Sequence, residues 1–100
     1  MITTKQRAYL RGLANKITPI FQVGKKGVED EAFIKQVEAA LEKRELVKIT
    51  VLENSGLTSR EASDFLCKEI GCEGVQAIGS KLVLYKQSKK NPTIELPTKK

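Results

Sequence analysis

The chain has 100 residues, of which 40% are apolar and none is histidine, and its formal net charge is +6. This length supports one domain, and the lack of histidine excludes a Ser-His or Cys-His catalytic pair. No apolar stretch is long enough for a signal peptide or a membrane span, so we expect a soluble, intracellular protein without membrane contacts.

The first predicted element is a helix that begins near Thr3. Thr3 and Gln6 have the spacing of a capping box, and apolar residues then recur on one side at positions 10, 13 and 17. The pair Thr18-Pro19 is expected to end this helix, because the residue before a proline disfavours helical geometry. Basic side chains flank the apolar stripe on both sides: Lys5, Arg7, Arg11 and Lys16.

A short strand is predicted at residues 20–23, followed by the turn Gly24-Lys25-Lys26-Gly27 and a second helix. That helix begins with three acidic residues at positions 29–31, which suits the helix dipole. Residues 46–52 alternate between apolar and polar side chains, as a second strand would. Three carboxylates before this strand have the spacing of a helix surface and are interpreted as part of a solvated helix face: Glu38, Glu42 and Glu45.

The third predicted helix opens with a second capping-box pair, Thr58 and Glu61, and Gly71 is expected to cap its C-terminal end. Strands at residues 75–78 and 81–85 follow, joined by a two-residue link suited to a tight hairpin. Beyond Lys86 the pattern stops. We therefore expect a domain at residues 1–86 and a basic, disordered tail at residues 87–100.

The resulting element order is αβαβαββ, without an internal repeat. Strands that alternate with helices require crossover connections and a partly parallel sheet, here closed by one antiparallel hairpin. The predicted fold class is α/β, a two-layer sandwich with three helices and a four-stranded mixed sheet.

Charge is unevenly distributed along the chain. Residues 1–28 carry six basic side chains and no acidic one, residues 29–85 have a net charge of −4, and residues 86–100 have a net charge of +4. Positive charge segregated in this way favours a polyanionic partner. The alternative is a solvated surface whose charge aids solubility.

The turn Gly24-Lys25-Lys26-Gly27 is the most specific feature of the sequence. Glycines permit tight backbone angles and remove side chains that would hold a phosphate away, and the two lysines add cations at the same place. The KH module clamps the nucleic-acid backbone with a loop of this composition. The alternative is an ordinary flexible connection. Arg7 and Arg11 are a like-charge pair at i, i+4, whose repulsion a bound phosphate would relieve.

No cofactor, metal site or catalytic centre is expected. A zinc site normally needs four ligands, and the two cysteines, Cys67 and Cys72, have no further cysteine or histidine to join them. They are interpreted as ordinary buried or half-buried thiols, with a disulfide or redox role as the alternative. Walker-type and dinucleotide-binding loops are absent from the sequence.

Several segments resemble the YhbY-like proteins, the stand-alone bacterial form of the CRM (chloroplast RNA splicing and ribosome maturation) domain. The resemblance covers residues 2–86 and is carried by the stretches at residues 5–14, 19–27, 45–52 and 78–85. Members often have histidine at the positions of Asn15 and Arg44 and a basic residue at that of Ser80, so RNA contacts at Asn15 and Ser80 are in doubt.

The resemblance implies a fold similar to the C-terminal domain of translation initiation factor 3. It also implies binding to structured RNA through Gly24, Lys25, Lys26, Gly27, Arg7 and Arg11, and Lys5 and Lys16 are candidates to extend this surface. We therefore expect a cytoplasmic, ribosome-associated, monomeric, non-enzymatic protein without a small-molecule substrate. It would dock on ribosomal RNA as a large-subunit assembly factor. The alternative is a protein-interaction module that binds a ribosomal protein or assembly partner.

Overall fold

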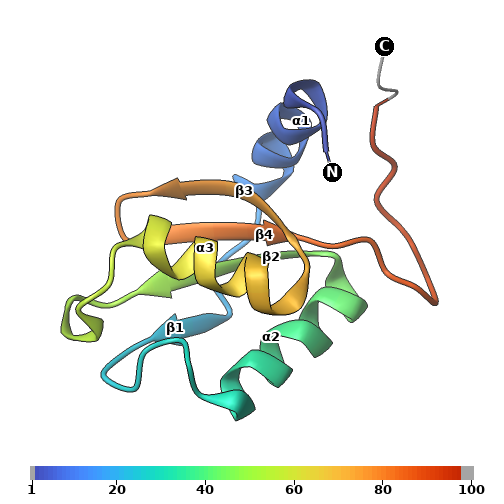
Figure 1. Cartoon of the computed structure of the whole chain (residues 1–100). Coiled ribbons are helices and arrows are strands. Elements are labelled where there is room, and N and C mark those ends of the chain that lie inside the picture. The colour runs from blue at the N-terminus through green and yellow to red at the C-terminus, as the bar shows by residue number, and fades with distance from the viewer. Residues whose placement is uncertain (1, 98–100) are drawn as a thin grey trace.

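The computed structural model describes residues 2–97, in which three α-helices pack around a four-stranded sheet (Figure 1). The helices are α1 (Thr4–Ala14), α2 (Glu31–Arg44) and α3 (Ser59–Ile70), and a short 3-10 helix, η1 (Glu53–Ser55), precedes α3. The strands are β1 (Phe21–Val23), β2 (Leu46–Val51), β3 (Glu73–Ile78) and β4 (Lys81–Tyr85). The predicted order αβαβαββ is confirmed.

The sheet has the strand order β1-β2-β4-β3 and is mixed, as predicted. β1 runs parallel to β2, with Val23 beside Val51, whereas β4 is antiparallel to both β2 and β3. The β3–β4 pair is the expected hairpin, and a register shift between Gly74 and Gln76 marks an irregularity in β3. The loop after β1, η1 and the β3–β4 hairpin therefore lie at the same end of the sheet, on the left of Figure 1.

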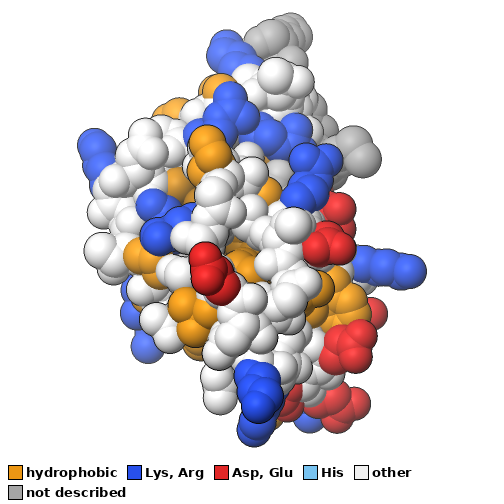
Figure 2. Space-filling model, turned by 90° about the vertical axis from the view of Figure 1, so that its left-hand side faces the viewer, with side chains coloured by type: hydrophobic (Ala, Val, Ile, Leu, Met, Phe, Trp, Pro, Cys, Tyr) orange, Lys and Arg blue, Asp and Glu red, His pale blue; other side chains and the backbone are white. Residues whose placement is uncertain are grey.

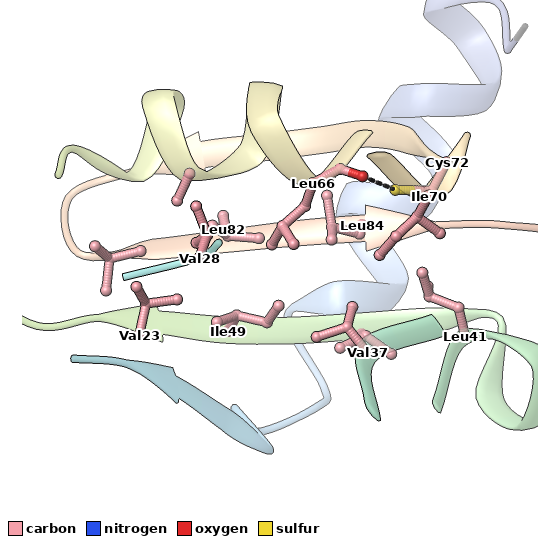
Figure 3. Packing of buried hydrophobic residues seen from close by; sticks show 13 residues of the cluster. Val23, Val28, Val37, Leu41, Ile49, Leu66, Ile70, Cys72, Leu82 and Leu84 are labelled. Carbon is pink, nitrogen blue, oxygen red and sulfur yellow. Dashed lines mark hydrogen bonds between the residues drawn. The ribbon is translucent and has the colours of Figure 1, made fainter. Parts of the chain in front are cut away.

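Side chains of the central strands point alternately to the two faces of the sheet. Val47 of β2 and Leu84 of β4 belong to the larger core, beneath α2 and α3, where Figure 3 shows the packing. Leu46 and Val83 face the other way, into a smaller core that includes Leu10 of α1. The sheet with α2 and α3 forms the predicted two-layer sandwich, and α1 covers part of the opposite face.

Local sequence signals account for most helix ends. Both predicted capping boxes are present, at Thr3 and at Thr58, and Gly71 ends α3 in the left-handed conformation at φ +79°. α1 ends at Ala14, earlier than the predicted boundary at Thr18-Pro19. From there the backbone continues in tighter i→i+3 hydrogen bonds as far as Ile17, since the chain must leave helical geometry before the proline.

The segment at residues 87–97 differs from the predicted disordered tail, of which residues 98–100 lie outside the described part of the chain. Ile94 and Leu96 pack against the smaller core, and the Gln6 side-chain amide donates a hydrogen bond to the Pro97 carbonyl at 2.9 Å. Figure 1 shows this segment leaving β4 and passing along the side of the molecule toward the start of α1. The polar composition of this segment did not indicate these contacts, because the residues that it contacts lie far away in the sequence.

Two carboxylates at the end of α2 hold the segment in place. Glu45 is fully buried, and its carboxylate accepts four hydrogen bonds of 2.7–3.0 Å from Ser88, Thr93 and Ile94. Glu42 accepts three more, from the Ser88 hydroxyl and from two backbone N–H groups at residues 89 and 90. The predicted solvated face is therefore wrong for Glu42 and Glu45, because both carboxylates serve as acceptors for a distant segment.

Glu45 also has an unusual backbone conformation. Its φ of +64° lies in a region that residues other than glycine rarely adopt, at a cost of about 1–3 kcal/mol. Its own N–H donates to the Leu41 carbonyl, and its carbonyl accepts from the Lys86 N–H, so that the turn from α2 into β2 is held on both sides. Burial raises the pKa of the Glu45 carboxyl, but the hydrogen bonds outweigh burial, and the net pKa lies below its ordinary value.

We expect Glu45→Ala to lower the free energy of unfolding by about 2 kcal/mol, because it removes a charged acceptor of several hydrogen bonds. Urea denaturation measures this loss, and limited proteolysis should show new cleavage at residues 87–97. Glu38→Ala is the matched control, since Glu38 is an exposed carboxylate of the same helix. Equal stability of the two variants would contradict the role given to Glu45.

The same carboxylates predict acid-dependent release of the segment. Hydrogen bonds from the Lys89 N–H, the Ser88 hydroxyl and the Lys90 N–H lower the pKa of Glu42 from 4.5 to about 2. A folded-state pKa below the unfolded value stabilises the fold above about pH 4.5, and this contribution is lost as the pH falls toward 2. Proteolysis at residues 87–97 should therefore increase across this window, and Glu42→Gln should flatten the dependence.

Candidate nucleic-acid interface

The glycine-lysine turn is a closed β-turn at the end of β1. The Gly24 carbonyl accepts a hydrogen bond of 2.9 Å from the Gly27 N–H, and Gly27 has a φ of +73°. Lys25 and Lys26 occupy the two central positions of the turn, and both side chains are exposed. The turn therefore presents two neighbouring cations to solvent at the tip of a strand.

Residues on either side hold this turn to the body of the protein. Val28, immediately after it, is buried in the larger core with 4% of its surface exposed. On the other side, Gly24 lies against Asn54 and Leu52, to whose side chains a Cβ at this position would come within 3.8 Å. The two lysines are exposed side chains on an anchored backbone.

The turn itself, rather than the start of α2, is available to an anion. Asp30 caps α2 by accepting a hydrogen bond of 3.1 Å from the Ala32 N–H, so a carboxylate already occupies the positive end of the helix. Among residues 2–97, the backbone amides of Lys25 and Lys26 have no hydrogen-bond acceptor. Two free amides and two ammonium groups are suited to phosphate oxygens.

Arg7 and Arg11 lie elsewhere, in a groove of about 740 Å³ between α1, α3 and β3, which we call the arginine groove. The Arg7 guanidinium donates from Nε to the Gly74 carbonyl at 3.0 Å, which fixes the side chain against β3. Arg60 of α3 also lines this groove and forms an exposed ion pair of 3.5 Å with Asp64. Such a pair adds little stability, so Arg60 can turn to another anion.

Lys16 lines a second groove, of about 460 Å³, between the end of α1, the start of β2 and residues 93–94. Three further cations line it: Lys43 and Arg44 at the end of α2, and Lys48 of β2. In the described part of the chain none of the four has a carboxylate partner. Their mutual repulsion would be relieved by a polyanion.

The eight predicted site residues do not form one continuous patch. β1 and β3 are the two outer strands, so the lysine turn and the arginine groove are separated by about 14 Å across three strand spacings. Lys5 is exposed on α1 but lines neither groove. Figure 2, which faces the end of the molecule with the turn, shows Lys and Arg side chains in the upper part, on the left side and at the bottom, with hydrophobic, uncharged and some acidic side chains between these groups.

Sequence reasoning missed four basic residues that the fold adds: Arg60, Lys43, Arg44 and Lys48. Lys48 had a signal, because it alternates with buried residues along β2 and must face away from the larger core. In the sequence, Arg60, Lys43 and Arg44 have the pattern of ordinary solvated helix residues. The element that each of them faces lies far away in the chain, so the sequence pattern could not indicate it.

Two further possibilities concern membranes and metals. No helix between residues 2 and 97 combines the length and apolarity needed to cross a bilayer. Within the same residues, no three Cys, Asp or Glu side chains are placed to hold a metal ion.

Three helices and a four-stranded mixed sheet, with an exposed Gly-Lys-Lys-Gly turn between β1 and α2, define a small α/β domain whose turn has the glycine-flanked composition of the loop in the KH module. The family model for the CRS1 / YhbY (CRM) domain matches residues 2–86. The chain belongs to this family.

Relatives match over nearly the whole chain. It is 50% identical to the probable RNA-binding protein YqeI of Bacillus subtilis, over 97% of this chain and 100% of YqeI. It is 34% identical to an RNA-binding protein of Haemophilus influenzae, over 98% of this chain and 97% of that protein. The solution structure of SAV1595 from Staphylococcus aureus superposes with a TM-score of 0.77 at 44% identity, covering 97% of this chain and all of that one.

The two glycines of the turn should respond differently to substitution. Gly27→Ala places a Cβ at a positive φ and should cost about 1–2 kcal/mol. Gly24→Ala is the matched control, because its Cβ would make only ordinary contacts of 3.8 Å without a positive φ. Chemical denaturation of both variants measures the difference, and a larger loss in Gly24→Ala would contradict the turn geometry.

Proposed function

We infer that the protein binds RNA, and we propose that its ligand is structured ribosomal RNA. Membership in the CRM family and the names of two relatives support RNA as the ligand. The observation that carries the proposal is the anchored turn, which exposes Lys25 and Lys26 and whose two central backbone amides have no acceptor among residues 2–97. Ligand binding at such a turn needs no catalytic group.

The distribution of charge favours recognition of an extended backbone. A ligand that reaches both the lysine turn and the arginine groove must span the width of the sheet, as a folded RNA can and a single nucleotide cannot. Exposed aromatic surface is scarce, with Tyr9 of α1 the large exposed aromatic of the described chain at 43%. Contacts to phosphate and sugar therefore outweigh base stacking in this proposal.

The cellular role is proposed from the family resemblance. We propose that the protein acts as a monomer in the cytoplasm, where it associates with precursors of the large ribosomal subunit during assembly. The separated basic surfaces are compatible with this role, because they would contact neighbouring RNA helices rather than one continuous strand.

The double substitution Lys25→Glu with Lys26→Glu should weaken binding to a large-subunit ribosomal RNA transcript at least tenfold at moderate salt. Removal of two phosphate contacts should also reduce the slope of log affinity against log salt by about 1.5. Filter binding or fluorescence anisotropy across a salt series measures both quantities, and thermal melting verifies that the variant is folded.

The control is Lys35→Glu with Lys68→Glu, which changes two exposed lysines of α2 and α3. Both double variants lower the net charge from +6 to +2, so a difference between them reports position rather than total charge. Equal loss in the two variants would refute a specific role of the turn. Cellular association that survives nuclease and high salt would favour the alternative of a protein partner.

A further inference from the structure

The face of the sheet that carries α1 is only partly covered by this helix. The apolar residues of α1 pack over Leu46 and Tyr85, which stand beside each other in β2 and β4, and over Val83 of β4. Val83 has 1% of its surface exposed, so the cover extends as far as this residue. The next cross-strand row toward the lysine turn lies beyond the helix, since the residues at its two ends, Gln22 and Ile78, are exposed to solvent.

This uncovered row contains one residue from each strand. In order across the sheet, its members are Gln22 of β1, Thr50 of β2, Lys81 of β4 and Ile78 of β3. Their sequence neighbours Val23, Val51 and Leu82 belong to the larger core, so the alternation along the strands points the row away from that core. Three of the four side chains are exposed, and that of Thr50 is half-buried. We call these four residues the open row.

The open row connects two of the basic sites across the sheet. At one end, Gln22 lies two residues before Gly24, where the lysine turn begins. At the other end, Ile78 lines the arginine groove. Three strand spacings give the row a length of about 14 Å, so it spans the whole separation between the turn and the groove.

The composition of this face suits a nucleotide chain. The open row has one lysine and no carboxylate, and Lys48, two residues before Thr50 on the same side of β2, adds a second cation. Ile78 at 64% and Ile20 at 39% are two of the three large hydrophobic side chains that the described chain exposes. Ile20 lines the second groove together with Lys48, so it lies on this face as well. Cations can contact phosphates here, and the apolar side chains can contact sugars and bases.

We propose that a backbone segment of the RNA crosses the sheet on this face, from the lysine turn over the open row to the arginine groove. This path rests on the proposed function and adds the route that the RNA takes. Lys81 contacts a phosphate at the centre of the path, and the side chains of Gln22 and Thr50 form hydrogen bonds with sugar and phosphate oxygens. The opposite side of the sheet is a poorer route, because α2 and α3 present exposed carboxylates there: Glu31, Glu38 and Glu61.

Backbone amide shifts in NMR spectra map the path directly. A short RNA hairpin is titrated at low salt into the full chain labelled with a nitrogen isotope, because phosphate contacts do not require a particular sequence. The amides of the open row should shift together with those of Lys25 and Lys26, whereas those of Glu38 and Glu61 should stay in place. Shifts at Glu38 and Glu61 with an unmoved open row would overturn the path. Shifts of the open row with poly-glutamate but not with RNA would assign this face to an acidic protein and would also overturn it.

Lys81→Glu tests the contact at the centre of the row. The side chain is exposed, so the variant should remain folded, which thermal melting verifies. Its affinity for the large-subunit ribosomal RNA transcript should fall several-fold, and the slope of log affinity against log salt should decrease by about 0.8, because one phosphate contact is lost. The matched control is Lys68→Glu, which makes the same change of charge at an exposed lysine of α3 and should have a smaller effect.

These variants distinguish the path from RNA binding itself. If Lys81→Glu and Lys68→Glu bind equally well while Lys25→Glu with Lys26→Glu loses affinity, the protein binds RNA through the turn and the path over the open row is wrong. If the unaltered protein has no affinity for RNA at low salt, the path and the proposed function are both wrong.

Discussion

The pairing of β2 with β4 is the interaction on which the rest of the structure depends. Val47 stands beside Leu84, Lys48 stands beside Val83, and successive pairs point to opposite faces of the sheet. Because both faces carry large apolar side chains, helices must cover both. α2 and α3 cover one face and α1 the other, and this arrangement sends Arg7 and Arg11 of α1 to the β3 edge, away from the lysine turn on the β1 edge.

This division explains the form of the candidate nucleic-acid surface. Positive charge is arranged as an anchored lysine turn and two grooves, each lined by cations from separate elements. A compact ligand can contact one of these basic sites, whereas an RNA with several backbone segments can contact all of them. Affinity would then come from many phosphate contacts of modest strength, and specificity from the shape of the RNA.

The segment after β4 shows how a polar stretch becomes part of a fold. The carboxylates of Glu42 and Glu45 accept seven hydrogen bonds from residues 88–94, and these bonds hold two apolar side chains over the smaller core. The strained backbone at Glu45 is held by the hydrogen bonds of its own N–H to the Leu41 carbonyl and of the Lys86 N–H to its carbonyl. The position of the segment after β4 thus depends on the charges of Glu42 and Glu45, which the sequence pattern had assigned to a solvated helix face.

The sequence by itself determined the local elements and the lysine turn. Apolar periodicity, two capping boxes and Gly71 act between near neighbours, so they could be read without the fold, and the family resemblance supported the αβαβαββ order. Only the tertiary structure decided which cations share a groove, that Glu45 is buried, and that the thiols of Cys67 and Cys72 line the groove of Arg7. These arrangements join residues distant in the chain, and such contacts are set by how strands and helices pack rather than by the spacing of residues along the sequence.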